Sequence, residues 1–204
     1  MSKRFLDKAY ALDTPEETRA LYDRWAASYD DEIAANGYAT PARVAHALAA
    51  QVGDRTAPVL DYGCGTGLSG EALHAAGFTV IDGMDPSPAM LDGAREKGVY
   101  RNLALLDLDD SAPLPQGAYP AITAAGVIGV GAAPADTLDM LLTALPPGGL
   151  LGFSFNDHAL ADPQYEGRLA PWLERGDARL LSREHGPHLP GAGIGAMVYV
   201  VART

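Results

Sequence analysis

The 204-residue chain is predicted to fold as an α/β protein built on a doubly wound, mostly parallel sheet. Three observations predict this class. From residue 57 onward, short apolar segments alternate with helical segments, glycine-containing breaks separate them, and two extended segments follow each other near the carboxyl terminus. The alternation favours parallel strands covered by helices on both faces, and the final pair is typical of an antiparallel hairpin at the sheet edge.

Each element follows from a local signal. Threonine–proline pairs at residues 14–15 and 40–41 place a hydroxyl at the N-cap before a proline, which predicts helices over residues 15–29 and 41–51. The Ser87-Pro88 pair predicts the same cap for a third helix, which is expected to close at Gly98. The strands of the alternating region are expected at residues 57–61, 78–84, 100–106, 121–125 and 150–155. Its helices are expected at residues 67–76, 87–98, 134–145 and 164–175, and the hairpin strands at residues 178–184 and 195–202.

Composition and charge limit the environment and the partners. Hydrophobic residues make up 48% and charged residues 20%, as in ordinary globular proteins. One cysteine, no apolar run of about 20 residues and no signal-peptide pattern predict a cytoplasmic protein without a membrane segment. The net charge of −11 repels phosphate backbones and anionic lipid surfaces, so neither nucleic acid nor a membrane is expected as a partner.

Three aspartates stand directly after predicted strands. Asp61, Asp85 and Asp107 follow one another at intervals of about one strand–helix unit. The carboxyl ends of neighbouring parallel strands meet at one edge of a sheet, where ligands bind, so the three carboxylates are expected to line one crevice. A single aspartate at such a position is usually a helix cap or a turn residue, but three in register behind a glycine loop indicate a ligand site.

The glycine loop has a direct physical interpretation. Gly63, Gly65 and Gly67 lack a Cβ atom, so the backbone can turn sharply and approach a ligand closely. The unpaired N–H groups of the following helix suit a carboxylate, here that of a methionine moiety. Asp61 is expected to hold the loop and to accept from the ligand ammonium group, and Asp85 to accept from both ribose hydroxyls.

The remaining contacts predicted from the residues concern adenine. Asp107 is expected to accept from the adenine amino group, while the Leu108 backbone N–H meets a ring nitrogen. Met90 is placed to pack on the adenine face, with ordinary core packing as its alternative role. Together these contacts describe S-adenosylmethionine (SAM).

A nicotinamide enzyme is the competing interpretation. Residues 65–70 match G-x-G-x-x-G, and Asp85 lies about 20 residues further on. Against it, Asp61 and Gly63 extend the loop upstream, Asp107 adds an acid that a dinucleotide does not need, and the final hairpin has no role in a second mononucleotide half. A SAM-binding protein without catalytic activity is a further alternative.

At this point the chain resembles a known family. VLDYGCGTG at residues 59–67, GMDPSPAML at 83–91 and LDL at 106–108 are similar to three motifs of class I SAM-dependent methyltransferases. YDRWAASYD at 22–30, with Gly37-Tyr38 and KGVY at 97–100, resembles the Williams–Beuren-region methyltransferase-like group.

The resemblance implies a fold and a larger set of cofactor contacts. It implies a Rossmann-like seven-stranded sheet of order 3-2-1-4-5-7-6 with the last strand antiparallel. Residues 1–53 would form a helical lid on a SAM-binding core of residues 54–204. Trp25 and Tyr29 would approach the methionine end of SAM, unless they only pack as a helix stripe. The motif positions add further cofactor contacts at Cys64, Pro86 and Ala125.

The predicted reaction is methyl transfer by a metal-independent enzyme to a small-molecule acceptor. No cluster of histidine, cysteine and carboxylate has metal-ligand spacing. If the nucleophile must lose a proton, His158, His188 and Tyr22 are the candidate bases, although structural roles are the simpler expectation for the histidines. Residues 124–126 lack the Asn/Asp-Pro-Pro-aromatic motif, so methylation of a base amine or a glutamine amide is not expected.

Overall fold

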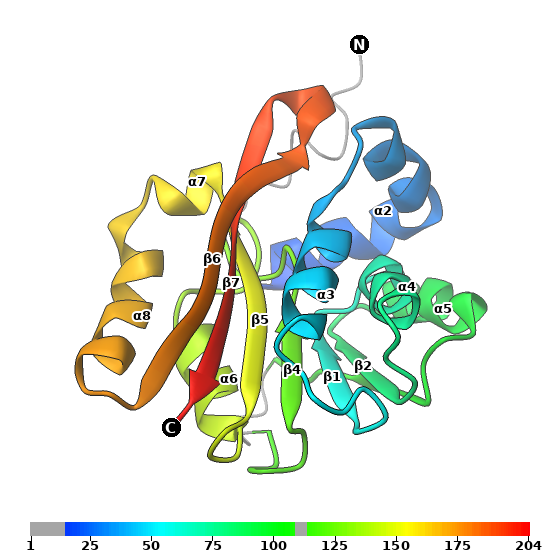
Figure 1. Ribbon diagram of the computed structural model, residues 1–204. Helices are drawn as coiled ribbons and strands as arrows, with labels where there is room; N and C mark the ends of the chain where they lie inside the picture. The colour runs from blue at the N-terminus through cyan, green and yellow to red at the C-terminus, as the bar shows by residue number, and fades with distance from the viewer. Residues whose placement is uncertain (1–14, 109–113) are drawn as a thin grey trace.

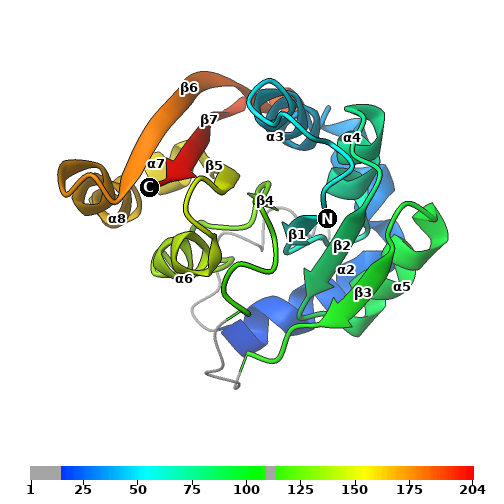
Figure 2. The same ribbon diagram turned by 60° about the horizontal axis from the view of Figure 1, so that its bottom comes forward.

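The computed structural model describes residues 15–108 and 114–204. They contain a seven-stranded sheet of order β3-β2-β1-β4-β5-β7-β6 with helices on both faces (Figures 1 and 2). The strands are β1 Val59–Tyr62, β2 Ile81–Asp85, β3 Asn102–Leu105, β4 Ala121–Ala124, β5 Leu150–Asn156, β6 Ala178–Leu189 and β7 Ile194–Arg203. The helices are α2 Pro15–Ala35, α3 Thr40–Ala49, α4 Leu68–Ala75, α5 Pro88–Lys97, α6 Thr137–Ala144, α7 Asp157–Leu160 and α8 Pro163–Glu174.

The sheet confirms the predicted fold class and strand order. Strands β1 to β5 run parallel, and β7 pairs antiparallel with both β5 and β6. The hairpin therefore inserts β7 into the sheet and leaves β6 at the edge (Figure 1). Strand β6 is longer than the expected 178–184, because pairing continues, with register shifts, through the segment rich in glycine and proline.

Two apolar cores hold the helices against the two faces of the sheet. On one face α3 and α4 contribute Leu48 and Leu73, which pack with Ile81 of β2. The other face carries the larger core, in which Leu141 of α6 and Leu169 of α8 join Leu60, Ile122 and Phe153 of the sheet. Figure 2 shows α3, α4 and α5 on one side of the strands and α6 and α8 on the other.

The predicted helix caps are correct at one helix and wrong at another. The Ser87 hydroxyl accepts from the Met90 backbone N–H at 3.1 Å, and Gly98 ends α5 at φ 66°, as predicted. The prediction that Thr40 caps its helix is wrong, because the residue at the cap is Ala39 and Thr40 lies inside α3. Its hydroxyl instead lies 2.7 Å from Nδ1 of His188. The predicted Thr14 cap lies outside the described residues.

Candidate cofactor and acceptor site

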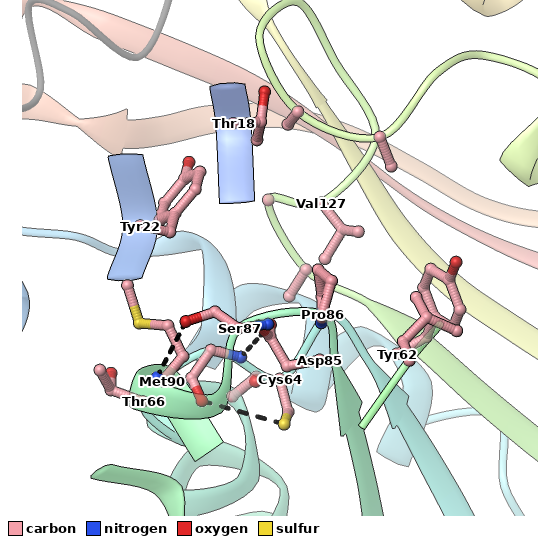
Figure 3. A pocket seen from close by; sticks show the side chains of 18 of the residues that line it. Thr18, Tyr22, Tyr62, Cys64, Thr66, Asp85, Pro86, Ser87, Met90 and Val127 are labelled. Carbon is pink, nitrogen blue, oxygen red and sulfur yellow. Dashed lines mark hydrogen bonds between the residues drawn. The ribbon is translucent and has the colours of Figure 1, made fainter. Parts of the chain in front are cut away.

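A cavity of about 310 Å³ lies at the carboxyl ends of β1, β2 and β4. The last residue of β2, Asp85, lies in its wall together with Gly63, Gly65 and Val127 from the loops after β1 and β4. Helix α2 contributes Thr18, Arg19, Tyr22 and Tyr29. Figure 3 shows Thr18 and Tyr22 on the opposite side of this space from Thr66, Asp85 and Met90. The sheet edge and α2 therefore enclose one cavity, in the position predicted for the ligand.

The glycine loop turns as its composition requires. Gly63, Gly65 and Gly67 have φ values of 69°, 54° and 96°, a region that other residues rarely adopt. Gly63 and Gly65 line the cavity, and a Cβ on Gly63 would lie 2.6 Å from Cγ2 of Val127. Gly67 does not line it. A Cβ there would instead lie 2.9 Å from Cγ of Lys97, so this glycine allows close packing behind the loop.

Asp85 lies at the tip of β2 and lines the cavity, with 8% of the residue exposed. Its carboxylate accepts from the backbone N–H of Gly65 and of Ser87, both at 2.9 Å. Burial raises the pKa of Asp85 to about 6, against the opposing effect of these two hydrogen bonds. The carboxylate is thus held rigidly at the cavity wall and retains further acceptor positions for a ligand.

Asp61 occupies a different environment from the predicted one. It is fully buried and does not line the cavity. Its carboxylate accepts from the hydroxyls of Ser69 at 2.6 Å, Tyr100 at 2.7 Å and Thr123 at 3.1 Å. Tyr100 also accepts from the Gly70 backbone N–H at 3.0 Å, so this network connects β1 to the first turn of α4. The geometry fits a residue that holds the loop from behind.

An apolar surface lies beside Asp85. Pro86, Met90, Leu106 and Leu108 line this part of the cavity, together with the Cys64 side chain. Met90 is 1% exposed and packs under the site. Asp107 is solvent-exposed and does not line the cavity, although both of its neighbours do.

Helix α2 is connected to the loops beneath it by hydroxyl–carboxylate hydrogen bonds. The Thr66 hydroxyl donates to Asp30 at 2.5 Å, and the Ser87 hydroxyl donates to Asp23 at 2.5 Å. Lys97 of α5 adds an ion pair to Asp30 at 2.9 Å. These contacts join α2 to the glycine loop and to the loop that carries Asp85.

The predicted aromatic contacts separate into two groups. Tyr22 and Tyr29 line the main cavity, whereas Trp25 does not. Trp25 is 1% exposed, its indole N–H donates to Glu32 at 3.0 Å, and its ring packs on that of Tyr29. The remaining predicted site residue of this cavity, Ala125, lies in its wall at the end of β4.

The histidine candidates lie outside the main cavity. His158 is exposed in α7, a short helix that the sequence analysis did not predict, and it does not line the cavity. His188 is 5% exposed near the end of β6 and lines a smaller neighbouring chamber. Of the three candidate bases, only Tyr22 lines the main cavity.

Several wall residues were not predicted. The Tyr38 hydroxyl donates to the Ala125 carbonyl oxygen at 3.4 Å, which brings the segment before α3 to the end of β4. Val127 and residues 132–134 belong to the loop after β4, and Tyr62 follows Asp61. The only sequence signal for Tyr38 was the Gly37-Tyr38 pair, which is part of the resemblance to the methyltransferase-like group. The loop after β4 carries no polar pattern that marks a ligand.

Comparison with known proteins decides the family. The sequence model of the methyltransferase-domain family matches residues 34–196, which include the whole glycine loop and the sheet up to β7. The chain belongs to this family. The methyltransferase resemblance of the sequence motifs is thereby confirmed, and the nicotinamide alternative is not supported.

Two relatives illustrate the range of this methyltransferase family. Human methyltransferase-like protein 27 is 33% identical over 158 residues, which cover 76% of this chain and 64% of that protein. Bovine 18S rRNA (guanine-N(7))-methyltransferase is 41% identical over 68 residues, 33% of this chain and 24% of that protein. The chain thus matches less than two thirds of the length of either relative.

Solved methyltransferases have the same fold. The 1,6-didemethyltoxoflavin-N1-methyltransferase of Burkholderia thailandensis, solved with S-adenosylhomocysteine, superposes with a TM-score of 0.63 and 22% identity. The match covers 95% of this chain and 92% of that one. The cofactor of the family is SAM. The carboxylate of Asp85 fits the ribose of SAM, and the glycine loop fits its methionine carboxylate. The apolar surface at Met90 fits the adenine.

The prediction that nucleic acid is not a partner is overturned. Relatives that match 61 to 68 residues of this chain at 39 to 41% identity are named as 18S rRNA methyltransferases. The prediction rested on the net charge of −11, but net charge does not fix the local potential at one edge of a sheet. Charge alone therefore does not exclude this acceptor class.

Residues 15–108 and 114–204 contain neither a candidate metal-ion cluster nor a membrane-spanning helix. No group of three or more histidine, cysteine or acidic side chains is arranged to hold a metal ion in these ranges. None of the helices described there combines the length and apolarity needed to cross a bilayer.

The raised pKa of Asp85 predicts a pH dependence of cofactor affinity. The predicted ribose contact needs the ionised carboxylate as hydrogen-bond acceptor, so the affinity for S-adenosylhomocysteine should fall as pH drops through about 6. At pH 5 it should be about tenfold weaker than at pH 7, since one pKa unit corresponds to a tenfold change. Calorimetric titrations from pH 7.5 to 5 would measure this.

Unfolding of this region would not produce the same result. Asp61 and Asp85 both have pKa values raised by burial, so their protonation favours the folded state as pH falls through about 6. The Asp85→Asn variant should bind more weakly at pH 7 and lose most of the change between pH 7 and 5. A pH dependence that persists in this variant would assign the titration to another group.

Proposed function

We propose that this chain is a SAM-dependent methyltransferase whose acceptor is a small molecule bound beneath α2. The observation that carries the proposal is the enclosure of the cavity. Helix α2 contributes Thr18, Tyr22 and Tyr29 to the wall and is hydrogen-bonded to the loops on the cofactor side. The part of the acceptor that enters between α2 and the end of β4 must be small, which supports a small-molecule acceptor.

The chain's own residues would hold the cofactor from one side. Asp85 accepts from the ribose hydroxyls, and the backbone around Gly65 faces the methionine end. Pro86, Met90 and Leu108 cover the adenine ring. Asp61 acts indirectly, because its three hydroxyl donors hold the loop in shape. When bound, SAM supplies an activated methyl group.

The lid role of the amino-terminal helices is part of this proposal. Methyl transfer needs alignment of the acceptor and exclusion of water more than it needs protein chemistry. Helix α2 lines the cavity and α3 packs against α4, β5 and β7, and these contacts support a lid role for residues 15–53. Tyr22 is the proposed proton acceptor if the nucleophile must be deprotonated, because it alone among the candidates lines the main cavity.

A labelled-methyl screen tests this function. The full chain with methyl-labelled SAM would be incubated with a pool of small metabolites and, separately, with total RNA. We expect label in the small-molecule fraction. Transfer to RNA alone would overturn the acceptor class, and no transfer to either pool would favour a SAM-binding protein without activity.

Controls separate binding from catalysis. Calorimetry should give heat with S-adenosylhomocysteine and none with NAD; the reverse result would overturn the cofactor assignment. Asp85→Ala should remove transfer. Asp92→Ala should keep it, because Asp92 is an exposed α5 residue paired with Arg95 and does not line the cavity.

A further inference from the structure

A smaller chamber adjoins the main cavity. It has a volume of about 50 Å³ and shares Tyr22, Tyr29 and Tyr38 with the cavity wall. Trp25 and the loop after β4 complete its apolar side. Among the residues that the structure describes, no aspartate, glutamate, lysine or arginine lines it. The described lining is therefore uncharged and mixes aromatic with aliphatic side chains, in a branch of the same binding site.

His188 lines this chamber in a defined state. Its Nδ1 lies 2.7 Å from the hydroxyl of Thr40, which is fully buried. Within the described ranges, Nδ1 is the only hydrogen-bond partner recorded for this hydroxyl. A buried hydroxyl must donate its proton, so Thr40 donates and Nδ1 accepts. The neutral imidazole then carries its hydrogen on Nε2.

The Nε2–H group opens onto the chamber. It has no hydrogen-bond partner among the described residues, yet no fully buried side-chain nitrogen or oxygen in this part of the chain lacks one. Nε2 therefore reaches free space, and His188 borders this chamber while only 5% exposed. Burial lowers the pKa of His188 to about 4, so the ring is neutral at physiological pH. The charges of Arg43 and His158 also lower this pKa, whereas the charge of Asp157 raises it.

Asn156 supplies a second donor to the same chamber. Its Oδ1 accepts from the Ala159 backbone N–H at 3.0 Å and caps α7, which fixes the orientation of the amide. The amide nitrogen has no recorded partner among residues 15–108 and 114–204. Ser154 lies two residues earlier on β5, on the same face of the strand, and also lines the chamber. The polar wall thus presents N–H donors and no charge.

We propose that this chamber binds the carbonyl end of a neutral aromatic acceptor, with His188 Nε2–H and Asn156 Nδ2–H as donors to the carbonyl oxygen. The aromatic body would lie between Tyr29 and Tyr38, at the boundary with the main cavity, so that the other end of the molecule faces the cofactor. The inference rests on the proposed function and names its acceptor class. It also makes His188 an acceptor-binding residue and not a base.

Two probe molecules of nearly the same shape test whether His188 and Asn156 donate hydrogen bonds to a carbonyl oxygen. Acetophenone carries a carbonyl, and α-methylstyrene replaces that oxygen with a methylene group. In saturation-transfer-difference NMR with S-adenosylhomocysteine at saturation, acetophenone should bind about 10- to 30-fold more tightly, as two hydrogen bonds of about 1 kcal/mol each predict. Equal affinities in the wild-type protein would overturn the proposal.

Variants assign the preference to the two donors. His188→Phe removes one donor, and Asn156→Asp removes the other while keeping an oxygen to cap α7. Each should reduce the preference for acetophenone at least threefold. His74→Phe, on the exposed side of α4, is the matched control and should keep it. Should His188→Phe fail to fold, Asn156→Asp decides, and an unchanged preference in that variant would overturn the proposal.

The same samples separate this inference from the proposed function. All folded variants should bind S-adenosylhomocysteine with wild-type affinity, because neither residue lines the main cavity. Retained cofactor binding and methyl transfer without a carbonyl preference would overturn the acceptor subsite alone. Loss of cofactor binding in the wild-type protein would overturn the function itself.

Discussion

Replacement of Asp85 by alanine should weaken S-adenosylhomocysteine binding by at least 100-fold. Two hydrogen bonds from ribose hydroxyls to an ionised carboxylate contribute about 1.5–3 kcal/mol each, which together correspond to a factor of about 150 or more. The loss is compounded because Gly65 and Ser87 would lose the acceptor of their backbone N–H groups. The glycine loop would then be less well ordered around the ligand.

Calorimetry on the folded variant measures this effect. Asp92→Ala, an aspartate-to-alanine change on the exposed surface of the adjacent helix, is the control and should leave affinity unchanged. Circular dichroism would check that both variants retain the fold. An Asp85→Ala affinity within tenfold of the wild type would show that the carboxylate does not contact the ribose.

The second large effect concerns stability. Alanine in place of glycine inside a helix normally stabilises a protein by about 0.5–1 kcal/mol. At Gly70 in α4 the opposite is expected, because a Cβ would lie 2.3 Å from Cζ and Oη of Tyr100. Overpacking costs about 1–3 kcal/mol, and displacement of Tyr100 breaks its bonds to Gly70 and Asp61. Gly70→Ala should lower the free energy of unfolding by about 2–4 kcal/mol.

Gly167→Ala is the matched control. Gly167 lies inside α8, and a Cβ there meets no atom within 4 Å. This variant should be as stable as the wild type or up to about 1 kcal/mol more stable. Urea denaturation of both variants would measure the difference. Equal stabilities for the two would mean that Tyr100 moves away at little cost.

The parts of the fold that sequence predicted correctly depend on local signals. Ser87 caps α5 through its own side chain, and Gly98 ends that helix in a left-handed conformation. Both are readable from a few neighbouring residues. Thr40 shows the limit of such signals, because its hydroxyl is taken by His188, which lies 148 positions away in sequence. A local pattern cannot reveal a partner of that kind.

The site residues that were predicted correctly also depend on local signals. Asp85, Met90 and the loop glycines Gly63 and Gly65 line the cavity, because strand ends and a tight turn fix their place. Asp61 is one residue short of the end of β1, in register with Gly83, whereas Asp85 is the last residue of β2. Asp61 therefore points into the protein, where three hydroxyls bind it. Which side of a strand end faces a ligand depends on neighbouring elements. Tyr38 and Val127 enter the wall through such tertiary contacts.

The hydrogen bonds from Thr66 to Asp30 and from Ser87 to Asp23 connect α2 to the two loops on the opposite side of the cavity. Thermodynamic coupling is reciprocal, so whatever orders the two loops must also order α2, by the same free energy. Cofactor binding should therefore slow amide hydrogen exchange along the whole length of α2, including the turns that do not line the cavity. Conversely, detachment of α2 should speed release of the bound cofactor.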